Sequence, residues 1–384
     1  MMQMRVKLES ASGKRPIFFG ATIVAALSFS FLVPCLSARP ADPPKDAALQ
    51  VYFVDVEGGQ ATLFVTPKGQ SLLIDTGWPD NQGRDADRIV AAAKLAGIKK
   101  IDYVLITHFH MDHVGGVPQL AAKIPIGEFI DHGENREPGD KATEQVWEAY
   151  KNLLDKEHPK RMIAKPGDVL PIEGLHAEVV SADGNLIEKP LPAGGEENAA
   201  CKISEQKPAD KTENPRSLGT IFTFGKVRIL DLGDLTWDKE IELMCPVNRL
   251  GKIEVLIVSH HGWYQSSSPA LIYGIQPRIA IMDNGATKGG TPSTWDIIHK
   301  SKGLEGFWQL HYSNEGGEAH NSPAPYLANL KGPDEGNYLK LTAWEDGSLA
   351  VYNSRTKETK KYSTTATTAQ AGSGTGSIRP KSNM

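Results

Sequence analysis

Short apolar runs separated by glycine- and proline-containing turns recur along most of the chain. The first three occupy residues 51–56, 62–66 and 71–74, and the turns between them contain Gly58-Gly59 and Pro67-Lys68-Gly69. Apolar runs of this length between such turns are typical of β-strands. The region is therefore predicted to form a β-meander.

Helical spacing follows the meander. Residues 84–96 carry apolar side chains at helical spacing and end at Gly97, a second helix is predicted at 143–154, and a further helix is expected to start near Leu120. The remaining predicted strands lie at residues 102–107, 177–181, 220–224, 227–232, 255–259 and 278–282, with a closing hairpin at 339–343 and 349–352. Strands thus come in two successive blocks, each with helices. This order predicts an α/β protein with two mixed sheets packed face to face and helices outside, rather than a doubly wound parallel sheet.

The N-terminal segment has the pattern of an export signal. Residues 1–15 are polar and basic, and residues 17–35 form an apolar run that is followed by small residues. These features predict a signal peptide at residues 1–38 and export to the periplasm or the medium, without stable membrane association after signal removal. An uncleaved anchor is the alternative, because the apolar run approaches the minimum length that spans a bilayer.

The rest of the chain is predicted to be one large domain at residues 48–355, which follows a Pro-rich linker at 39–47. Within the domain, residues 184–216 are polar and interrupted by prolines, which predicts a surface insertion near a site. Residues 356–384 are predicted to be a disordered tail, since Ser, Thr, Ala and Gly dominate the end of the chain.

Composition narrows the class of partner. The 384 residues contain 42 Lys and Arg against 46 Asp and Glu, a net charge of −4. A surface of that sign has no general attraction for nucleic acid, so a small-molecule or small phosphodiester substrate is expected, and a polynucleotide would need a local basic groove. Three cysteines exclude a disulfide-stapled module. Cys201 and Cys245 could pair or stay free, and the oligomeric state is left open.

Four potential metal ligands fall within six residues, directly after a predicted strand. Residues 107–116 read THFHMDHVGG. His108 and His110 can face one point, while Asp112 and His113 on the following turn face a second. Imidazole nitrogen and carboxylate oxygen are both good zinc ligands, so this spacing predicts two divalent ions a few ångströms apart.

This motif resembles the HxHxDH signature of the metallo-β-lactamase superfamily, and other motifs of that family follow in order over roughly residues 48–355. Asp75, in Asp-Thr-Gly, resembles the early aspartate that supports the metal loop. Asp234 stands where the family has its bridging carboxylate, and residues 259–262 (SHHG) stand where it has its last histidine. The resemblance implies an αββα sandwich and a metal-dependent hydrolase. It also implies two divalent ions, with zinc expected and manganese as the alternative.

Within the superfamily, the chain resembles the hydrolase domain of the ComEC-type competence proteins and its secreted relatives. They share the Ser-His-His-Gly motif and a segment like residues 214–218 (NPRSL). The chain departs from many members because no third histidine for the first ion occurs near this point. Asn214 or water is expected to complete that position, and His132 and His320 are the other candidates.

The sequence does not decide which of His260 and His261 binds metal, because adjacent residues of a strand point to opposite sides. The position of Gly262 favours His261, and His260 would then orient a ligand or reach the substrate. Asp55 and Asp231 are expected to hydrogen-bond loop backbone rather than bind metal. Three aromatic residues flank the metal loops and could form the pocket wall: Trp78, Trp263 and Tyr264.

The expected mechanism uses a hydroxide that bridges the two ions as the nucleophile, so no serine or cysteine nucleophile is needed. Asp112 and Asp234 would hold the second ion, and either could take up the released proton. The leading expectation is an exported hydrolase of a phosphodiester or related phosphoryl substrate. Hydrolysis of a lactam, lactone or thioester by the same centre is the alternative. A non-catalytic binding protein is disfavoured because the ligand positions are intact.

Overall fold

A computed structural model describes residues 47–79 and 81–364. The predicted signal peptide at 1–38, residues 39–46 of the predicted linker and residues 365–384 of the predicted tail lie outside the described residues. Among the residues that are described, no helix is both long enough and apolar enough to cross a membrane.

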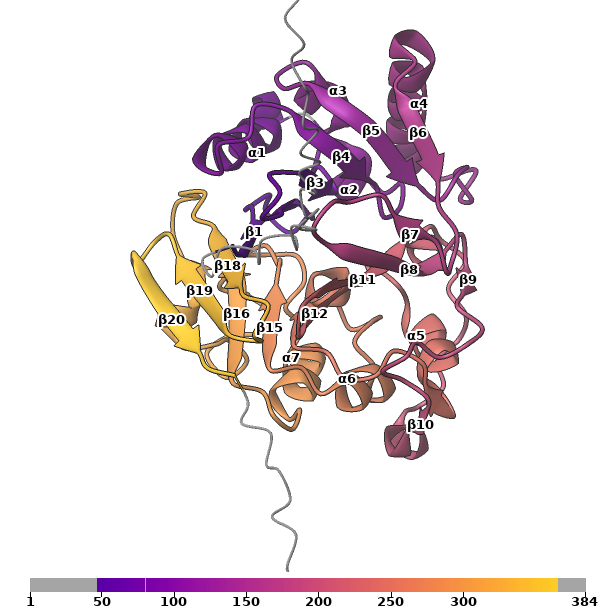
Figure 1. Ribbon diagram of the computed structural model, residues 1–384, viewed down its shortest axis with the longest axis vertical. Coiled ribbons are helices and arrows are strands. Elements are labelled where there is room, and N and C mark those ends of the chain that lie inside the picture. The colour runs from indigo at the N-terminus through magenta and orange to yellow at the C-terminus, as the bar shows by residue number, and fades with distance from the viewer. Residues whose placement is uncertain (1–46, 80, 365–384) are drawn as a thin grey trace, which may run out of the picture. The chain divides into compact units, whose positions relative to one another are not determined.

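Two large sheets form the centre of the described chain (Figure 1). The first has the strand order β20-β19-β18-β1-β2-β3-β4-β5-β6; neighbours are antiparallel up to β3 and parallel beyond it. Its strands are β1 (Leu49–Phe53), β2 (Thr62–Val65), β3 (Ser71–Ile74), β4 (Ile101–Leu105), β5 (Ile126–Asp131), β6 (Lys160–Ile163), β18 (Leu339–Ala343), β19 (Leu349–Asn353) and β20 (Glu358–Tyr362).

The second sheet has the order β17-β16-β15-β14-β12-β11-β8-β7, and β9 pairs with β8. Neighbours are parallel from β17 to β12 and antiparallel beyond it. Its strands are β7 (Val169–Leu170), β8 (His176–Ala182), β9 (Asn185–Leu186), β11 (Gly219–Phe224), β12 (Val227–Asp231), β14 (Val255–Ile257), β15 (Ile279–Met282), β16 (Gly306–His311) and β17 (Leu327–Asn329); β10 (Glu196–Glu197) and β13 (Val247–Asn248) form a separate pair.

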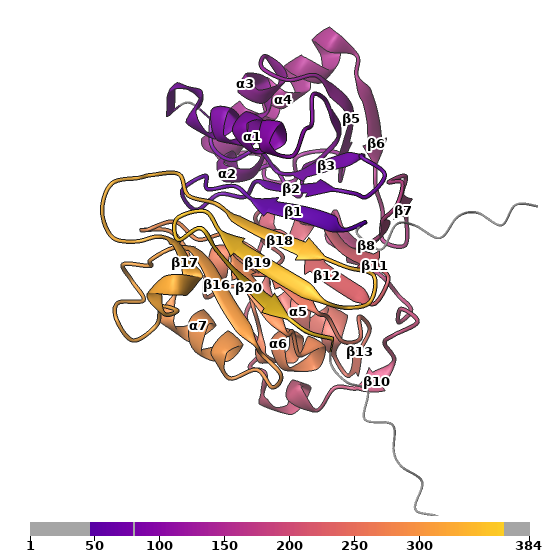
Figure 2. The same ribbon diagram turned by 60° about the vertical axis from the view of Figure 1, so that its left-hand side comes forward.

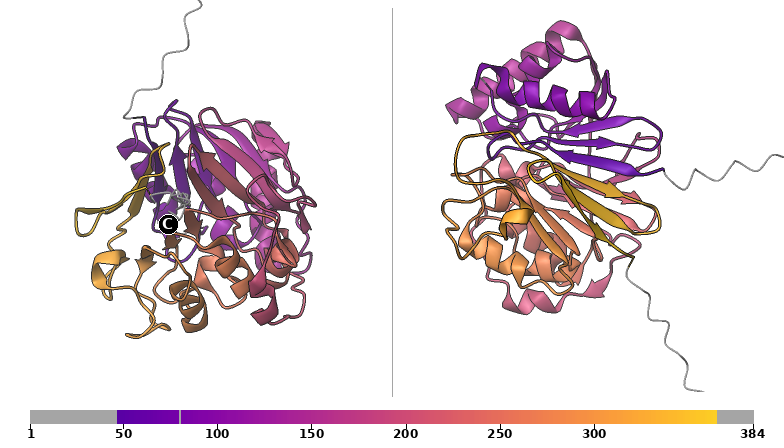
Figure 3. Two further views of the ribbon diagram at one scale, coloured as in Figure 1. Left: turned by 60° about the horizontal axis from the view of Figure 1, so that its bottom comes forward. Right: turned by 90° about the vertical axis from the view of Figure 1, so that its left-hand side faces the viewer.

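Helices cover the outer faces of both sheets (Figure 2), with α1, α3 and α4 on one side and α5, α6 and α7 on the other. The right-hand view of Figure 3 shows the two sheets between these helices. The α-helices are α1 (Arg84–Leu95), α2 (Met111–Val114), α3 (Val117–Ala121), α4 (Lys141–Glu157), α5 (Trp237–Met244), α6 (Pro269–Ile275) and α7 (Pro292–His299). The short 3₁₀ helices are η1 (Asn81–Gly83), η2 (Ala199–Ile203), η3 (Asn214–Arg216), η4 (Ser259–Gly262) and η5 (Ala324–Tyr326).

Three apolar clusters hold these layers together. The central cluster lies between the sheets, where the rings of Phe64 and Phe222 have centroids 4.6 Å apart. A second cluster packs the first sheet against helices through residues such as Ile89 and Tyr150, and a third packs the second sheet against helices through residues such as Ile272. Each sheet thereby buries both faces. The predicted αββα sandwich of two mixed sheets is confirmed.

The C-terminal boundary of the domain differs from the prediction. The chain does not become a tail at residue 356, because Glu358–Tyr362 forms β20 and pairs antiparallel with β19. Tyr362 is buried, and its hydroxyl accepts a hydrogen bond from Trp308 Nε1 at 2.9 Å. The segment ETKKY is rich in charged residues, as edge strands often are. It therefore lacks the alternation of apolar and polar residues from which a strand is predicted.

The predicted surface insertion at residues 184–216 also needs correction. Much of it is exposed, but its end is not, since Glu213 and Asn214 are buried. The Glu213 carboxylate accepts a hydrogen bond from the backbone N–H of Phe109 at 3.2 Å. The end of the insertion therefore supports the metal-ligand loop instead of lying on the surface.

A disulfide joins Cys201 to Cys245 across a sequence separation of 44 residues. Cross-linking residues this far apart restricts the unfolded chain, so reduction should lower the free energy of unfolding by about 4 kcal/mol. Urea denaturation with and without reductant measures the change. The double variant Cys201→Ser/Cys245→Ser should match the reduced protein and show no response to reductant. An unchanged unfolding midpoint on reduction of the parent protein would contradict this expectation.

Candidate metal centre

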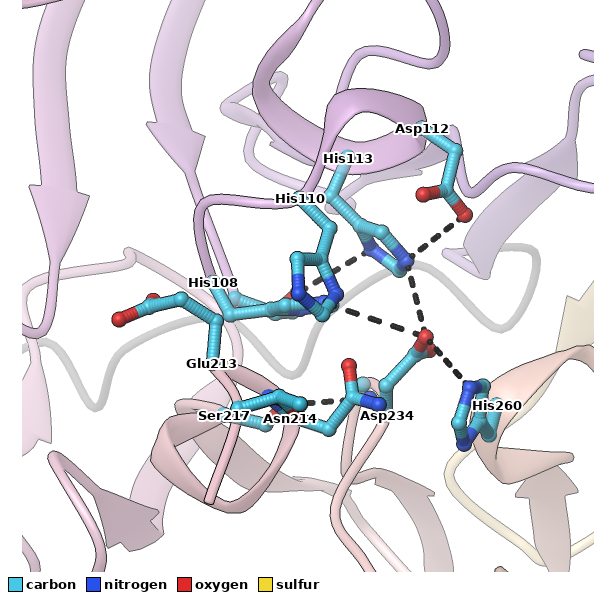
Figure 4. A network of polar contacts seen from close by, with 12 residues as sticks. His108, His110, Asp112, His113, Glu213, Asn214, Ser217, Asp234 and His260 are labelled. Atoms are coloured by element: carbon cyan, nitrogen blue, oxygen red, sulfur yellow. Dashed lines mark hydrogen bonds and ion pairs between the residues drawn. The ribbon is translucent and has the colours of Figure 1, made fainter. Parts of the chain in front are cut away.

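The predicted ligands meet where β4, β12 and β14 end (Figure 4). His108 and His110 follow β4, Asp112 and His113 lie on α2, Asp234 follows β12, and His260 and His261 lie in η4 directly after β14. His260 and His261 both have left-handed backbone, with φ of 56° and 52°. Such strain costs roughly 1–3 kcal/mol per residue and concentrates at functional sites.

Four buried side chains form one ligand group. Asp112, His113, Asp234 and His261 place one ligand atom each within 4.8 Å of one another. The Nε2 atoms of His113 and His261 are 3.2 Å apart. Asp112 Oδ2 lies 3.3 Å from His113 Nε2 and 3.1 Å from His261 Nε2. The Nε2 atoms of His113 and His261 and the carboxylate oxygens of the two aspartates therefore converge on one point.

A second pair of nitrogens lies beside this group. His108 Nε2 and His110 Nδ1 are 3.0 Å apart, and His108 Nε2 is 3.9 Å from Asp234 Oδ2. The same Asp234 oxygen lies 3.3 Å from His113 Nε2 in the first group. Asp234 therefore stands between two sets of nitrogens, as a bridging carboxylate would.

Three of the histidines have their other ring nitrogen against a carboxylate. The pairs are His110 Nε2–Glu137 Oε2 at 2.9 Å, His113 Nδ1–Asp75 Oδ2 at 2.7 Å and His261 Nδ1–Asp283 Oδ1 at 3.3 Å. A carboxylate hydrogen-bonded in that position, as for His110 and His113, fixes the tautomer and leaves the facing nitrogen free to bind a metal. The His261–Asp283 contact lacks hydrogen-bond geometry, so Asp283 acts on His261 through its charge. The sequence pointed to Asp75 through its motif. No sequence motif indicated Glu137 or Asp283. The one usable signal was that Asp283 comes directly after a predicted strand.

The residues fit a divalent cation. Asp234 Oδ1 and Asn214 Oδ1 are buried without a hydrogen-bond partner, although an unsatisfied buried oxygen is costly. His113 Nδ1 donates to Asp75 Oδ2 at 2.7 Å, so Nε2 of the neutral His113 ring is a lone-pair acceptor directed at His261 Nε2, 3.2 Å away, and a cation between the two rings suits it. The donor set of imidazole nitrogen and carboxylate oxygen is one that zinc and manganese accept.

The two central carboxylates are held in their charged form. Burial alone opposes ionisation, but Lys288 and His113 hold the pKa of Asp112 well below its usual range. Burial likewise opposes ionisation of Asp234, but His113 and His261 hold its pKa well below the usual range. Both carboxylates are therefore ionised, which is the form that binds a cation.

Both residues of the His-His pair reach the centre. His261 belongs to the four-residue group. His260 Nε2 lies 3.4 Å from Asp234 Oδ2, and its Nδ1 lies 3.3 Å from Ser266 Oγ. Burial lowers the pKa of His260 to about 4, so its ring is neutral near pH 7. His260 is therefore a candidate, together with the buried Asn214, to complete the set around His108 and His110.

Two other histidines, which the sequence analysis offered as ligands for the first metal position, have partners outside the ligand motifs. His132 Nε2 contacts Glu213 Oε2 at 3.0 Å, and its ring packs against Phe109. His320 lies against the Trp295 ring, with Nε2 3.8 Å from Asp296 Oδ1. For neither residue is a contact with His108, His110 or Asp234 described, so the structure gives no support to either as the group that completes the first metal position. The reason is tertiary, because each ring is held by partners far from the motif in sequence.

The two aspartates expected to be structural differ from each other. Asp231 accepts hydrogen bonds from Gln60 Nε2 at 2.5 Å and from the Gly233 backbone N–H at 2.9 Å, as expected of a loop support. Asp55 lies in a second group, with Glu57 and His311, that could hold an ion. However, Arg88 Nη1 also donates to Asp55 Oδ2 at 3.1 Å, and the positive guanidinium neutralises the negative charge of the Asp55 carboxylate. Asp55 therefore belongs to an ion-pair network.

The loops that carry Asp234 and the histidine pair also form the wall of a hollow. Its volume is about 430 Å³, and its lining includes Lys207, Trp237 and Tyr264. The Lys207 ammonium lies 3.5 Å from the centroid of the Trp237 ring and donates to the Tyr264 carbonyl oxygen at 2.7 Å. Tyr264 thus lines a hollow beside the centre, as expected, and Trp263 packs against it with ring centroids 5.6 Å apart.

Glu137→Gln should weaken binding of the ion at His108 and His110 by about tenfold, because an amide holds the His110 tautomer less firmly than a carboxylate. Titration with zinc against a chromophoric chelator measures each binding step. The matched control is Glu134→Gln, which changes an exposed glutamate three residues away and should bind both ions as the parent does. Two unchanged binding steps in Glu137→Gln would show that Glu137 does not orient a ligand.

The sequence model of the metallo-beta-lactamase superfamily matches residues 54–195. The UPF0173 protein of Pyrococcus abyssi is 43% identical over 266 residues, which cover 65% of this chain and 96% of that protein. This chain therefore belongs to the metallo-β-lactamase superfamily, whose members are generally metal-dependent hydrolases that use divalent metals.

Two further relatives refine the similarity. ComE operon protein 3 of Bacillus subtilis is 26% identical over 292 residues, which cover 72% of this chain and 32% of that protein. The resemblance to the ComEC type is thereby confirmed, although this chain spans only about a third of that relative. Hydroxyacylglutathione hydrolase of Stenotrophomonas maltophilia is 36% identical over 86 residues, which cover 22% of this chain and 30% of that protein.

Proposed function

We propose that this protein is an exported hydrolase that binds two divalent ions and cleaves a phosphodiester or related phosphoryl substrate. The observation that carries the proposal is the convergence of two sets of imidazole nitrogens on one buried carboxylate, Asp234. Zinc is the expected metal and manganese the alternative, since both accept nitrogen and oxygen ligands.

Each ion would have its own ligand set. His108, His110 and Asp234 would hold the first, completed by Asn214 or His260. The second would be held by Asp112, His113, Asp234 and His261. When bound, the two ions would supply an activated water near neutral pH and a Lewis acid for the electrophile.

The residues of the chain contribute position and charge. Glu137 and Asp75 would orient His110 and His113 through hydrogen bonds, and Asp283 would act on His261 through its charge, so the centre would reorganise little when substrate arrives. Asp112 and Asp234 both lie 3.3 Å from His113 Nε2, and we expect one of these carboxylates to take up the released proton.

Support for the substrate comes from the resemblance to the ComEC-type hydrolase domain. The net charge of −4 favours a small phosphodiester over a polynucleotide, so nucleic acid is not the expected partner. The 86-residue similarity to hydroxyacylglutathione hydrolase favours a second candidate, cleavage of a thioester or a related lactone or lactam. The same ligands would serve either reaction.

Support for export comes from two independent features. Residues 1–38 have the pattern of a signal peptide. The Cys201–Cys245 disulfide is of a kind that persists in oxidising compartments such as the periplasm or the medium. A fusion of residues 1–60 to a reporter that is active only after export tests the proposal, and retention of the reporter in the cytosol would contradict it.

The catalytic proposal is tested on the purified mature chain. Metal content is measured by elemental analysis, and hydrolysis of bis-p-nitrophenyl phosphate, S-lactoylglutathione and nitrocefin is measured with and without a chelator. Near two equivalents of metal with chelator-sensitive phosphodiester turnover is expected. Turnover of the thioester or of nitrocefin alone would replace the substrate proposal with the second candidate. Absence of both metal and turnover would overturn the function.

A further inference from the structure

A lysine that the sequence did not single out contacts the metal centre. Lys288 follows β15, and its ammonium contacts Asp112 Oδ2. The ammonium also lies 5.1 Å from the centroid of the Trp78 ring. The Lys288 side chain is 30% exposed, whereas that of Asp112 is 9% exposed. Lys288 therefore stands between the buried ligands and solvent.

The backbone around Lys288 is held in place. Lys288 accepts a hydrogen bond from the Gly285 N–H at 2.9 Å, and the Gly290 N–H donates to the His261 carbonyl oxygen at 2.9 Å. On the other side, a Cβ added to Gly58 would lie 3.0 Å from Lys288 Cβ and 2.8 Å from Gly285 N. The loop is thus packed between the histidine pair and the Gly58 turn. Only the side chain of Lys288 is free to change its partner.

Asp112 is a poor permanent partner for this ammonium. The oxygen that Lys288 contacts is the one that lies 3.3 Å from His113 Nε2 and 3.1 Å from His261 Nε2. That oxygen belongs to the ligand group of the second ion. An ammonium and a divalent cation on the same carboxylate oxygen repel each other, strongly so at a buried position. A lysine fixed here therefore needs another anion within its reach.

We propose that Lys288 binds an anionic oxygen of the substrate beside Asp112 and so makes the centre selective for anionic substrates. That this anion is a phosphoryl group rests on the proposed function. A lysine ammonium is a point charge that suits phosphate oxygen, and it has three donors to share between partners. The face of Trp78 offers the ammonium a second contact when the anion has left.

The test compares Lys288→Met and Lys288→Arg with the parent, all loaded with zinc. The matched control is Lys340→Met on β18, because the Lys340 ammonium also lies over an aromatic ring, 5.7 Å from the centroid of Tyr52. Three quantities are measured: metal content, the dissociation constant of inorganic phosphate by calorimetry, and KM and kcat for bis-p-nitrophenyl phosphate.

Lys288→Met should keep its metal, while the phosphate dissociation constant and KM both rise about tenfold or more and kcat changes much less. Lys288→Arg should recover most of the affinity, and Lys340→Met should behave as the parent. Loss of metal from Lys288→Met would overturn the inference, since Lys288 would then serve Asp112 alone. Unchanged phosphate affinity in Lys288→Met, or no phosphate binding by the parent, would also overturn it.

The calorimetric measurement separates this inference from the proposed function. If the parent binds phosphate more tightly than Lys288→Met but does not cleave the phosphodiester, the anion site stands and the proposed substrate fails. If the parent cleaves the phosphodiester and Lys288→Met does so with the same KM and phosphate affinity, the function stands and the inference about Lys288 fails.

Discussion

Asp234→Asn should reduce turnover of bis-p-nitrophenyl phosphate by about 10³-fold, a loss of about 4 kcal/mol of transition-state stabilisation. Asp234 is the carboxylate that lies near both sets of histidine nitrogens, 3.9 Å from His108 Nε2 and 3.3 Å from His113 Nε2. Asparagine keeps the shape but has no charge and only one oxygen acceptor. The variant should therefore also retain less metal, as elemental analysis would show.

The control for this prediction is Asp87→Asn, which removes one negative charge from an exposed side chain paired with Lys123. Turnover and metal content should stay at parental levels, because an exposed ion pair contributes little. The expected fold-change is measured as kcat/KM at saturating metal, so that a change in affinity for metal is kept apart from a change in chemistry. Parental kcat/KM in Asp234→Asn would contradict the bridging role.

Asp75→Asn should weaken zinc binding by about 100-fold. The Asp75 carboxylate lies 2.7 Å from His113 Nδ1 and accepts hydrogen bonds from the Thr107 hydroxyl at 2.6 Å and the Thr107 N–H at 2.8 Å. An amide would place a donor against one of these donors, which leaves a buried group unsatisfied and costs about 1–3 kcal/mol of folding free energy. Competition with a chelator measures the first effect and urea denaturation measures the second.

Asp231→Asn separates the two effects. Asp231 is also buried and also accepts two hydrogen bonds, from Gln60 Nε2 and the Gly233 N–H, but no contact with a histidine is described for it. Its replacement should lower stability and leave zinc affinity near that of the parent. If Asp75→Asn lost stability without losing zinc affinity, Asp75 would be only a structural support of the loop.

Local pattern was sufficient for the strands and helices that have clear turns at their ends. The strand predicted at 71–74 is β3, and the hairpin predicted near the C-terminus is β18 and β19. The pattern of apolar residues did not predict β20, because this polar edge strand forms by pairing with β19 and not through a preference of its own residues.

In the candidate metal centre, too, some residues could be predicted from local sequence and others could not. The ligands at residues 108–113 lie in one short motif whose spacing suits zinc-binding side chains, so a single sequence points to them. Asp234 and the His260-His261 pair were found through the resemblance to the family. The groups that orient those ligands have no such spacing. Glu137 and Asp283 each contact one histidine through a fold that joins segments distant in sequence. Lys288 reaches Asp112 across 176 residues.

Apolar periodicity predicted the class of fold, and ligand spacing predicted the metal-binding cluster at residues 108–113, because both are local properties of the sequence. Asp234 and the His260-His261 pair were predicted from the resemblance to the metallo-β-lactamase superfamily. The tertiary structure alone decided that His132 and His320 lie apart from the centre and that Cys201 and Cys245 pair. It also decided that Lys288 stands at the mouth of the centre. The reason is physical: these are contacts between side chains on separate strands and loops, and only the packing of two sheets sets their distances.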